Sequence, residues 1–537
     1  MNRQFRFLLL LFFSSQLFGQ YQYQRLNHIR SLRSSAPLYS KAADIHTSIQ
    51  PFDTWEMDSI IAEGSEGWEQ SLTFDYKQWL WRKAFQEHLV DVRGRNYWFT
   101  IDPVVNFQIG ADREDNGDLK YVNTRGFTLE GRLGKKVTFS SSYLENQADF
   151  ADYIGNYTRY RDVVPGQGFA RPYNNGGFDF GLPSGEVTFT PDEIFSVTAG
   201  QGRNFFGEGY RSIFLSDAAF NYPFLRIETT FWKVKYTNLW AQLYDVRPQA
   251  QVSSNGAHAK KYLSSHYLSI NITPRWNVSF FEAIITGDTA QQTGIDASFF
   301  NPVIFYRPVE FAVGSRSGNA HIGLASSYKL ADGLQGYGQF LLDEFILERL
   351  LDGDGFWANK FAWQIGVKDY NLIGLTGLFG RLEYNGARPY TYAHRNPLTN
   401  YGHYGQPLAH PWGANFHEVL GQLVYQRKRW ELEARLHLGV MGLDTNSSDW
   451  GGDIYLPSGN RERAIGNTTS QGVKGSYTFV LLRLGWLVNP ATGLKVEAGA
   501  RIRNLSATGV TLPFSSGSSQ YFFVGLRTEF FNTYYDF

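Results

Sequence analysis

The chain contains no cysteine, which removes disulfides, thiolate catalysis, zinc–thiolate sites and any lipid anchor attached to cysteine. It also has no excess of charge, because 50 Lys and Arg balance 50 Asp and Glu. No overall field would therefore attract nucleic acid, and we predict no nucleic-acid partner.

Long apolar runs are missing as well. Past residue 20 no stretch approaches the roughly 20 apolar residues that a membrane helix requires, and the mean hydropathy is only −0.33. Aromatic residues nevertheless make up 17% of the chain, and glycine reaches 54. From residue 97 onward, segments of about ten residues alternate apolar with polar side chains, which is typical of strands with one face on lipid and one on a polar interior. This pattern predicts an all-β transmembrane barrel.

Segment 430–438 illustrates the alternation. Trp430, Leu432 and Leu436 share one face, while Glu433 and Arg435 share the other. A slip of one residue would move charged groups into hydrocarbon, at about 2–4 kcal/mol for each Arg near the midplane. The alternation therefore fixes the register, and we expect the inward-facing charges to pair with one another.

The connectors alternate between short and long. Eight short turns and nine long loops require eighteen strands, an even number with both ends on the same side. A chain with a secretory leader then has both termini in the periplasm and its long loops outside the cell. The short turns lie near 134–136, 191–192, 232–233, 274–275, 331–333, 370–371, 427–429 and 490–493, and the long loops near 111–119, 147–183, 203–218, 247–257, 287–319, 346–359, 386–414, 442–471 and 504–517.

Residues 1–19 have the basic start and short apolar run of a signal peptide, with an uncleaved anchor as the alternative. Residues 20–96 differ from the rest of the chain. A capped pattern at 54–61 and the spacing of Trp81, Phe85 and Leu89 predict short helices there. We expect these helices to plug the periplasmic mouth of the barrel formed by residues 97–537, with a flexible appendage as the alternative.

The last strand is predicted at 521–530, with Phe522, Val524, Leu526, Thr528 and Phe530 on one face. The chain then ends in the aromatic residue Phe537. A terminal aromatic after an amphipathic strand resembles the signal that outer-membrane assembly machinery reads.

Loop 203–218 carries the densest set of candidate ligand-binding side chains. Its glycines are no dinucleotide fingerprint, since no helix opens after them. We interpret the loop as a polar, aromatic-lined surface that binds sugar hydroxyls, and the alternative is a loop folded inward and tied to the wall by ion pairs. The candidates are Arg203, Asn204, Tyr210, Arg211 and Asp217.

Three further stretches of long loop combine arginine or histidine with aromatics and proline. Their glycan-binding candidates are Arg307, Glu310, Arg388, Tyr390, His403 and Trp412.

No catalytic residue, metal ligand or cofactor site is predicted. The spacings of His394, His403, His410 and His417 match no metal-ligand signature. The carboxylates Asp343, Glu344 and Glu348 could serve a glycosidase only at a suitable separation, which a sequence does not reveal.

Stretches 207–217, 301–308, 338–345 and 402–410 resemble the Wzi-like capsule assembly family, and more closely its gliding-motility branch, the RemB proteins. The resemblance implies an eighteen-stranded outer-membrane barrel with a helical bundle at its periplasmic end. It also implies a non-catalytic role in holding or organising surface polysaccharide, or in surface motility.

The sequence thus favours a non-enzymatic outer-membrane protein that binds surface polysaccharide. Its other expected partners are outer-membrane lipid, lipopolysaccharide and further outer-membrane proteins. Two alternatives remain: a diffusion or uptake channel, and a scaffold subunit of an outer-membrane complex.

Overall fold

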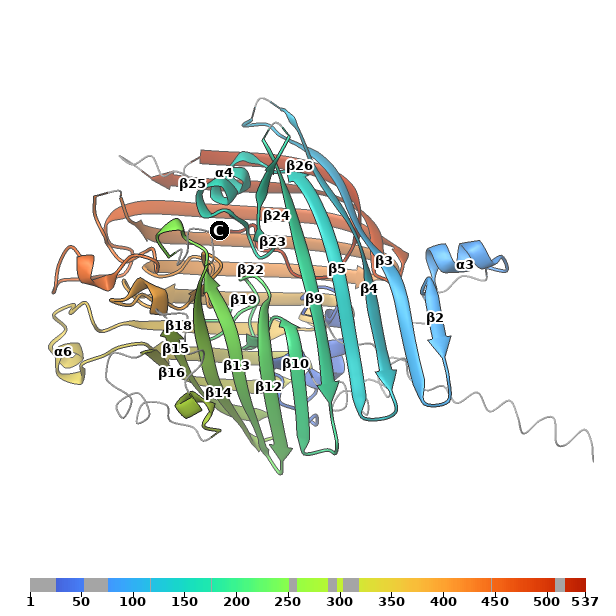
Figure 1. The fold of residues 1–537 in the computed structure, drawn as a ribbon, viewed down its shortest axis with the longest axis horizontal. Coiled ribbons are helices and arrows are strands. Elements are labelled where there is room, and N and C mark those ends of the chain that lie inside the picture. The colour runs from blue at the N-terminus through green and yellow to red at the C-terminus, as the bar shows by residue number, and fades with distance from the viewer. Residues whose placement is uncertain are drawn as a thin grey trace, which may run out of the picture.

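The computed structural model describes residues 26–52, 76–115, 117–174, 176–250, 258–287, 297–302, 318–445, 447–507 and 517–537. Within these residues eighteen strands close an antiparallel barrel, as predicted (Figure 1). Closure is made by the last strand on the first, with Tyr521 opposite Asp112 and Arg527 opposite Asn106. The barrel strands are β3 (Tyr97–Asp112), β4 (Leu119–Leu133), β5 (Val137–Asp149), β9 (Gly177–Phe189), β10 (Phe195–Gly202), β12 (Tyr222–Phe231), β13 (Val234–Asp245), β14 (Ala259–Thr273), β15 (Trp276–Gly287), β16 (Gly318–Ala331), β17 (Leu334–Leu342), β18 (Phe361–Asp369), β19 (Leu378–Ala387), β22 (Phe416–Arg427), β23 (Trp430–Leu443), β24 (Val473–Asn489), β25 (Leu494–Ala507) and β26 (Gly517–Thr528).

The two-residue alternation sets the wall as expected. Along β23, Leu432 and Leu436 are exposed on the outside, while Glu433 and His437 are buried inside. Inward charges pair with one another, as expected: Lys495 contacts Glu431 at 2.7 Å. The outer face is therefore apolar and the inner face polar, as a lipid-embedded barrel requires.

All eight predicted short turns lie at one end of the barrel, here called the short-turn end, and the long connectors lie at the other, the long-loop end. Exposed aromatic residues gather where strands reach the short-turn end, which is the girdle that barrels place at a membrane interface. Members of this girdle are Tyr97, Phe189, Phe195, Phe231, Trp276, Tyr328 and Trp430.

The seam between β26 and β3 departs from the prediction. β26 ends at Thr528, which is buried, and Phe530 packs inside the barrel against a cluster that includes Val104, so neither residue continues the outward face. The edge of β3 that β26 leaves unpaired is covered by β2 (Val90–Arg93), whose Val90 lies opposite Ile101. The sheet therefore begins at Val90, and the unpaired edge is protected.

Residues 26–52, the N-terminal segment, lie inside the barrel. They contain α1 (Leu32–Ser35), η1 (Ala36–Tyr39) and β1 (Ile49–Gln50). Tyr39 stacks on Tyr370 of the wall connector at 4.7 Å, and the ammonium of Lys329 donates to the carbonyl of Ala43 at 2.6 Å. The segment therefore covers the short-turn end from within.

The helix predicted from the spacing of Trp81, Phe85 and Leu89 is shorter than expected. α3 spans Trp79–Phe85 and stops before Leu89, which precedes β2. The helix predicted at 54–61 and the signal peptide lie outside the described residues. None of the helices in the described part of the chain has the length and apolar character needed to span a bilayer.

The remaining elements belong to the connectors. They are β6 (Val163–Val164), β7 (Gly168–Phe169), β8 (Arg171–Tyr173), β11 (Phe205–Phe206), β20 (Gly402–His403), β21 (Gln406–Pro407), α4 (Asp152–Arg161), α6 (Leu347–Asp352), η3 (Pro248–Ala250), η4 (Ala297–Phe300), η5 (Leu372–Gly374), η6 (Pro397–Thr399) and η7 (Ser458–Asn460).

Candidate functional site

Three long connectors join into one surface at the long-loop end, which we call the loop cap: residues 343–360, 388–415 and 444–472. Backbone hydrogen bonds connect them directly. The amide of Trp357 donates to the carbonyl of Ala464 at 2.9 Å, and the amide of Tyr390 donates to Gly451 at 2.9 Å. The loop cap is therefore one ordered surface rather than three independent loops.

Two tryptophan–arginine pairs lie on the loop cap. The guanidinium carbon of Arg461 is 4.3 Å from the ring centroid of Trp357, and that of Arg463 is 5.4 Å from Trp450. Both tryptophans and Arg461 are half-buried, and Arg463 is exposed. A tryptophan face can stack on the C–H face of a sugar, while a guanidinium donates hydrogen bonds to hydroxyl or carboxylate oxygens.

These four residues are not among the predicted glycan contacts. They lie in segments predicted as long loops, and they share with Arg388 and Tyr390 the pattern of an arginine beside an aromatic residue. The signal was therefore present, but the pairing of Trp357 with Arg461 spans two connectors and is created only by the fold.

The predicted residues Arg388 and Tyr390 are in the loop cap, but they hold it together. Arg388 lies over the ring of Phe361 at 5.3 Å and donates to the carbonyl of Asn467 at 3.4 Å. Tyr390 is only 1% exposed and donates its hydroxyl to the carbonyl of Asp449 at 2.9 Å. The prediction of Tyr390 as a surface contact is therefore wrong.

The connector 203–221, the inner loop, folds into the barrel. Arg203, Asn204, Tyr210, Arg211 and Asp217 are all buried. The interpretation of this loop as an exposed sugar-binding surface is therefore wrong, and the inward-folded alternative holds. The physical reason is that the polar side chains of the loop hydrogen-bond to partners inside the barrel, whereas on an exposed loop they would hydrogen-bond to water.

Arg211 is the centre of the buried polar network. Its guanidinium donates to the carboxylate of Asp536 at 3.0 Å and to that of Glu418 at 3.1 Å. Tyr210 donates its hydroxyl to the other oxygen of Asp536 at 2.8 Å. Burial alone would raise the pKa of Asp536, but Arg211, His437 and Arg435 outweigh it and hold the pKa well below its usual range. Asp536 is therefore an anion that anchors the chain end to the inner loop.

The other predicted residues of the inner loop are satisfied locally. Arg203 donates to Asn221 at 2.8 Å and to the carbonyl of Asp217 at 2.9 Å. The side-chain oxygen of Asn204 accepts from Arg226 at 2.8 Å.

Residues 529–537, the tail, follow β26 into the barrel, where Figure 1 places the C-terminus. Tyr534 donates its hydroxyl to Asp217 of the inner loop at 2.5 Å. His28 of the N-terminal segment lies 2.8 Å from the Tyr534 hydroxyl, and Arg503 of the wall donates to the carbonyl of Phe537 at 2.9 Å. The chain therefore ends inside the bore, in contact with the inner loop, the N-terminal segment and the wall.

The predicted residues Trp412 and His403 also face inward. Trp412 donates its indole N–H to the carbonyl of Asp536 at 3.0 Å. His403 is buried and accepts from the amide of Tyr244 at 3.0 Å. Their role in the structure is to fix loop 388–415 to the tail and wall. Arg307 and Glu310 lie outside the described residues.

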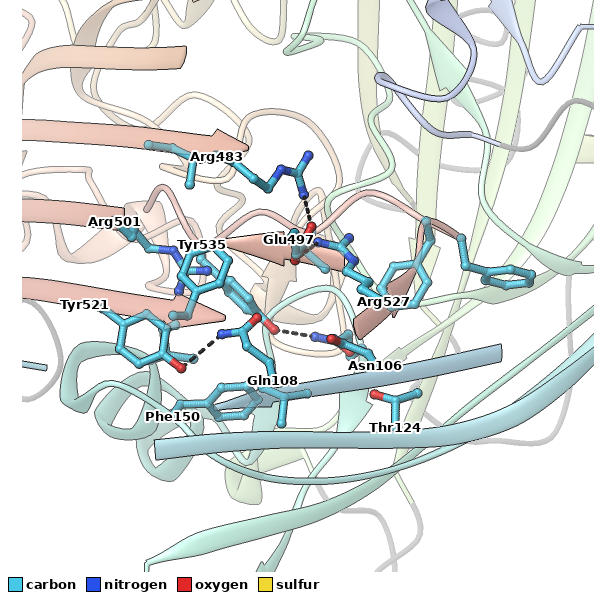
Figure 2. Close-up of a pocket in the computed structure, with 18 of the residues that line it drawn as sticks. Asn106, Gln108, Thr124, Phe150, Arg483, Glu497, Arg501, Tyr521, Arg527 and Tyr535 are labelled. Carbon is cyan, nitrogen blue, oxygen red and sulfur yellow. Dashed lines mark hydrogen bonds and ion pairs between the residues drawn. The ribbon is translucent and has the colours of Figure 1, made fainter. Parts of the chain in front are cut away.

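Small cavities remain beside the tail. One, of about 70 Å³, lies between β3, β4, β24–β26 and the tail, and Figure 2 shows Arg483, Arg501 and Arg527 around it with Glu497. Another, of about 80 Å³, borders Arg203. Each has room for a few ordered waters rather than for a sugar ring.

The three carboxylates of the candidate acidic cluster lie in separate environments. Asp343 accepts from the amide of Tyr392 at 2.8 Å, Glu344 pairs with Lys360 at 3.4 Å, and Glu348 is exposed. Across the described ranges no three His, Asp or Glu side chains converge as metal ligands.

Comparisons with known proteins extend the description of the fold. No protein-family model and no curated protein sequence matches the chain. Wzi of Escherichia coli, an outer-membrane protein involved in group 1 capsule assembly and described as a carbohydrate-binding β-barrel, matches with a TM-score of 0.57 and 12% identity over 94% of this chain and 98% of Wzi.

Weaker matches include OprD of Pseudomonas aeruginosa, with a TM-score of 0.42 and 11% identity over 81% of this chain and 96% of that one. OccAB2 of Acinetobacter baumannii has a TM-score of 0.42 and 8% identity, over 80% and 97% of the two chains. The likeness to Wzi covers nearly the whole of both chains, and it shows that this protein has the fold of an outer-membrane β-barrel.

Proposed function

We propose that this protein is a non-enzymatic outer-membrane barrel that binds or organises surface polysaccharide, capsule or exopolysaccharide, through its loop cap. The observation that carries the proposal is the pair of partly exposed tryptophan–arginine contacts, Trp357 with Arg461 and Trp450 with Arg463, on one ordered surface. The carbohydrate binding attributed to Wzi, which shares the fold, supports the same choice.

The proposal includes an orientation. The loop cap faces the cell exterior and the short-turn end faces the periplasm, because bacterial barrels have short periplasmic turns and long extracellular loops. Polysaccharide at the cell surface then meets the loop cap directly.

Binding would rest on repeated weak contacts. Each tryptophan face and each guanidinium contributes little to a single sugar, but a polymer presents the same sugar many times, and neighbouring copies of the protein act together. Retention of a long chain therefore needs no deep pocket.

The filled interior of the barrel favours binding of polysaccharide at the loop cap over transport of solutes through the bore. The N-terminal segment, the inner loop and the tail occupy the bore and are joined by buried contacts such as Arg211 with Asp536. A diffusion channel, the alternative, would require these segments to leave the bore.

Support for gliding motility is part of the same proposal, since a cell that retains surface polysaccharide can use it for traction.

A matched pair of double variants tests the proposal. Trp357→Ala with Arg461→Ala removes one pair from the loop cap, and Trp232→Ala with Lys233→Ala removes a tryptophan–cation pair of similar kind, at 5.8 Å, from the short-turn end. Binding of the purified proteins to polysaccharide from the source cells is measured by biolayer interferometry. Folding of each variant is checked by comparing the migration of boiled and unboiled samples in SDS–PAGE. We expect the first variant to lose roughly tenfold in affinity and the second to bind like the wild type. Equal binding by all three, or no binding by the wild type, would sink the proposal.

A further inference from the structure

The short helix α3 presents large apolar side chains to the outside of the molecule. Trp79 is 58% exposed, Leu80 65% and Trp81 48%. Exposing two tryptophans and a leucine on one helix of seven residues is unfavourable in water, because transfer of such apolar side chains out of water lowers the free energy. The helix therefore needs an apolar or amphipathic neighbour.

α3 is fixed to the rim of the barrel. Asn489 at the β24–β25 turn donates to the carbonyls of Lys83 at 3.0 Å and of Glu87 at 2.9 Å, and Arg429 of the β22–β23 turn donates to the carbonyl of Phe85 at 3.0 Å. β2, which follows α3, pairs with β3. Figure 1 accordingly shows α3 beside the short-turn end of the wall.

The exposed face lies near the surface that meets lipid, because Arg429, which binds the carbonyl of Phe85, directly precedes Trp430 in the chain. Trp430, at the start of β23, is 55% exposed and belongs to the aromatic girdle at this end. Trp486 lies opposite it in the ladder. Trp79 and Trp81 thus add to a belt of aromatics at the level where barrels cross from hydrocarbon to headgroups.

Charge on the helix matches a phospholipid surface. Arg82 and Lys83 follow the tryptophans, and both pair with Glu87, at 3.3 Å and 3.2 Å. Lys77, just before the helix, is exposed. Basic groups beside tryptophans are the composition of a helix that lies in the plane of a membrane interface.

We propose that α3 is an interfacial anchor, with Trp79, Leu80 and Trp81 inserted among the headgroups and upper acyl chains of the leaflet at the short-turn end. Its ligand is the phospholipid surface, and its role is to fix the rim of the barrel, including β2 over the edge of β3, at a set depth in the membrane. This inference is independent of polysaccharide binding.

The absence of native cysteine makes the test direct. Leu80→Cys is spin-labelled in the full-length protein in phosphatidylcholine nanodiscs, and the collision rates of the label with oxygen and with a water-soluble nickel chelate are compared. Leu432→Cys on the lipid face and Lys135→Cys in the β4–β5 turn serve as references. We expect the oxygen-to-nickel ratio at position 80 to lie several-fold above that at 135 and toward that at 432. A ratio equal to that at 135 would overturn the proposal, and so would a label shielded from both reagents, which would mean that protein covers the helix.

A second measurement separates membrane insertion from local packing. Trp79→Gln with Trp81→Gln is added to the Leu80→Cys protein, and Trp232→Gln is added in a parallel control, because Trp232 is an exposed tryptophan elsewhere at the same end. The double variant is expected to lower the oxygen-to-nickel ratio at position 80, whereas the control leaves it unchanged. An unchanged ratio in the double variant contradicts the anchor.

Discussion

At the scale of single residues, the interior of the barrel depends on paired charges rather than on apolar packing alone. Arg211 is 1% exposed and connects the inner loop, the tail and the wall through Asp536 and Glu418. A buried pair of this kind adds little net stability, but loss of one partner leaves an uncompensated charge. Arg211 is therefore the residue at which the internal assembly is most sensitive.

Replacing Arg211 tests this dependence. In Arg211→Met, Asp536 and Glu418 lose their shared partner, and we expect the docked tail to be destabilised by about 3–5 kcal/mol. Digestion by a carboxypeptidase in detergent measures the change: the wild-type tail resists, whereas the variant is trimmed. Arg463→Met, at an exposed position of the loop cap, is the control. Equal resistance of Arg211→Met and wild type would contradict the role assigned to this residue.

The loop cap contains carboxylates with unusual protonation. Burial and the neighbouring Asp444 raise the pKa of Asp449 to about 7, and burial raises the pKa of Asp444 to about 6. An unfolded Asp releases its proton near pH 4. Between these limits the folded cap binds more protons than the unfolded chain, so its free energy of unfolding falls as the pH rises from about 4 to about 7.

Amide hydrogen exchange of residues 449–453 measures this effect. After correction for intrinsic rates, we expect stronger protection at pH 5.5 than at pH 8. Asp449→Asn removes most of the difference because an amide does not titrate, whereas Asp332→Asn in an exposed short turn keeps it. Protection that does not change with pH in the wild type is the opposing result.

At the scale of elements, the tail and β2 have different roles at the seam between β26 and β3. β26 stops at Thr528 so that the tail can enter the bore, and β2 covers the edge of β3 that is left unpaired. The tail in turn packs against the inner loop through Tyr534 and Asp217. β26 therefore closes the wall, and the tail that directly follows it fills the bore.

Truncation of the chain after Glu529 separates these tasks. The wall keeps its strand pairings, while the bore loses the tail that borders its cavities. We expect stepwise conductance in planar bilayers from the truncated protein and none from the wild type, with heat-modified migration showing that the barrel still forms. A truncated protein that stays silent would mean that the inner loop and the N-terminal segment seal the bore without the tail.

At the scale of the whole molecule, the wall followed from the sequence and the interior did not. The wall obeys a local rule, since each lipid-facing position such as Leu432 or Leu436 must be apolar, and a shift of register is costly. Whether a loop turns inward depends on partners distant in the chain: Arg211 meets Asp536 more than three hundred residues away. Composition gives the same signature to an exposed sugar-binding loop and to a buried ion-paired one.

The position of the tail has a practical consequence for handling the protein. Phe537 lies within the bore, between Arg503 of the wall and the aromatic rings of α4. An affinity tag or fluorescent fusion appended after Phe537 would have to displace this packing or thread past it, so labels belong in the exposed turns.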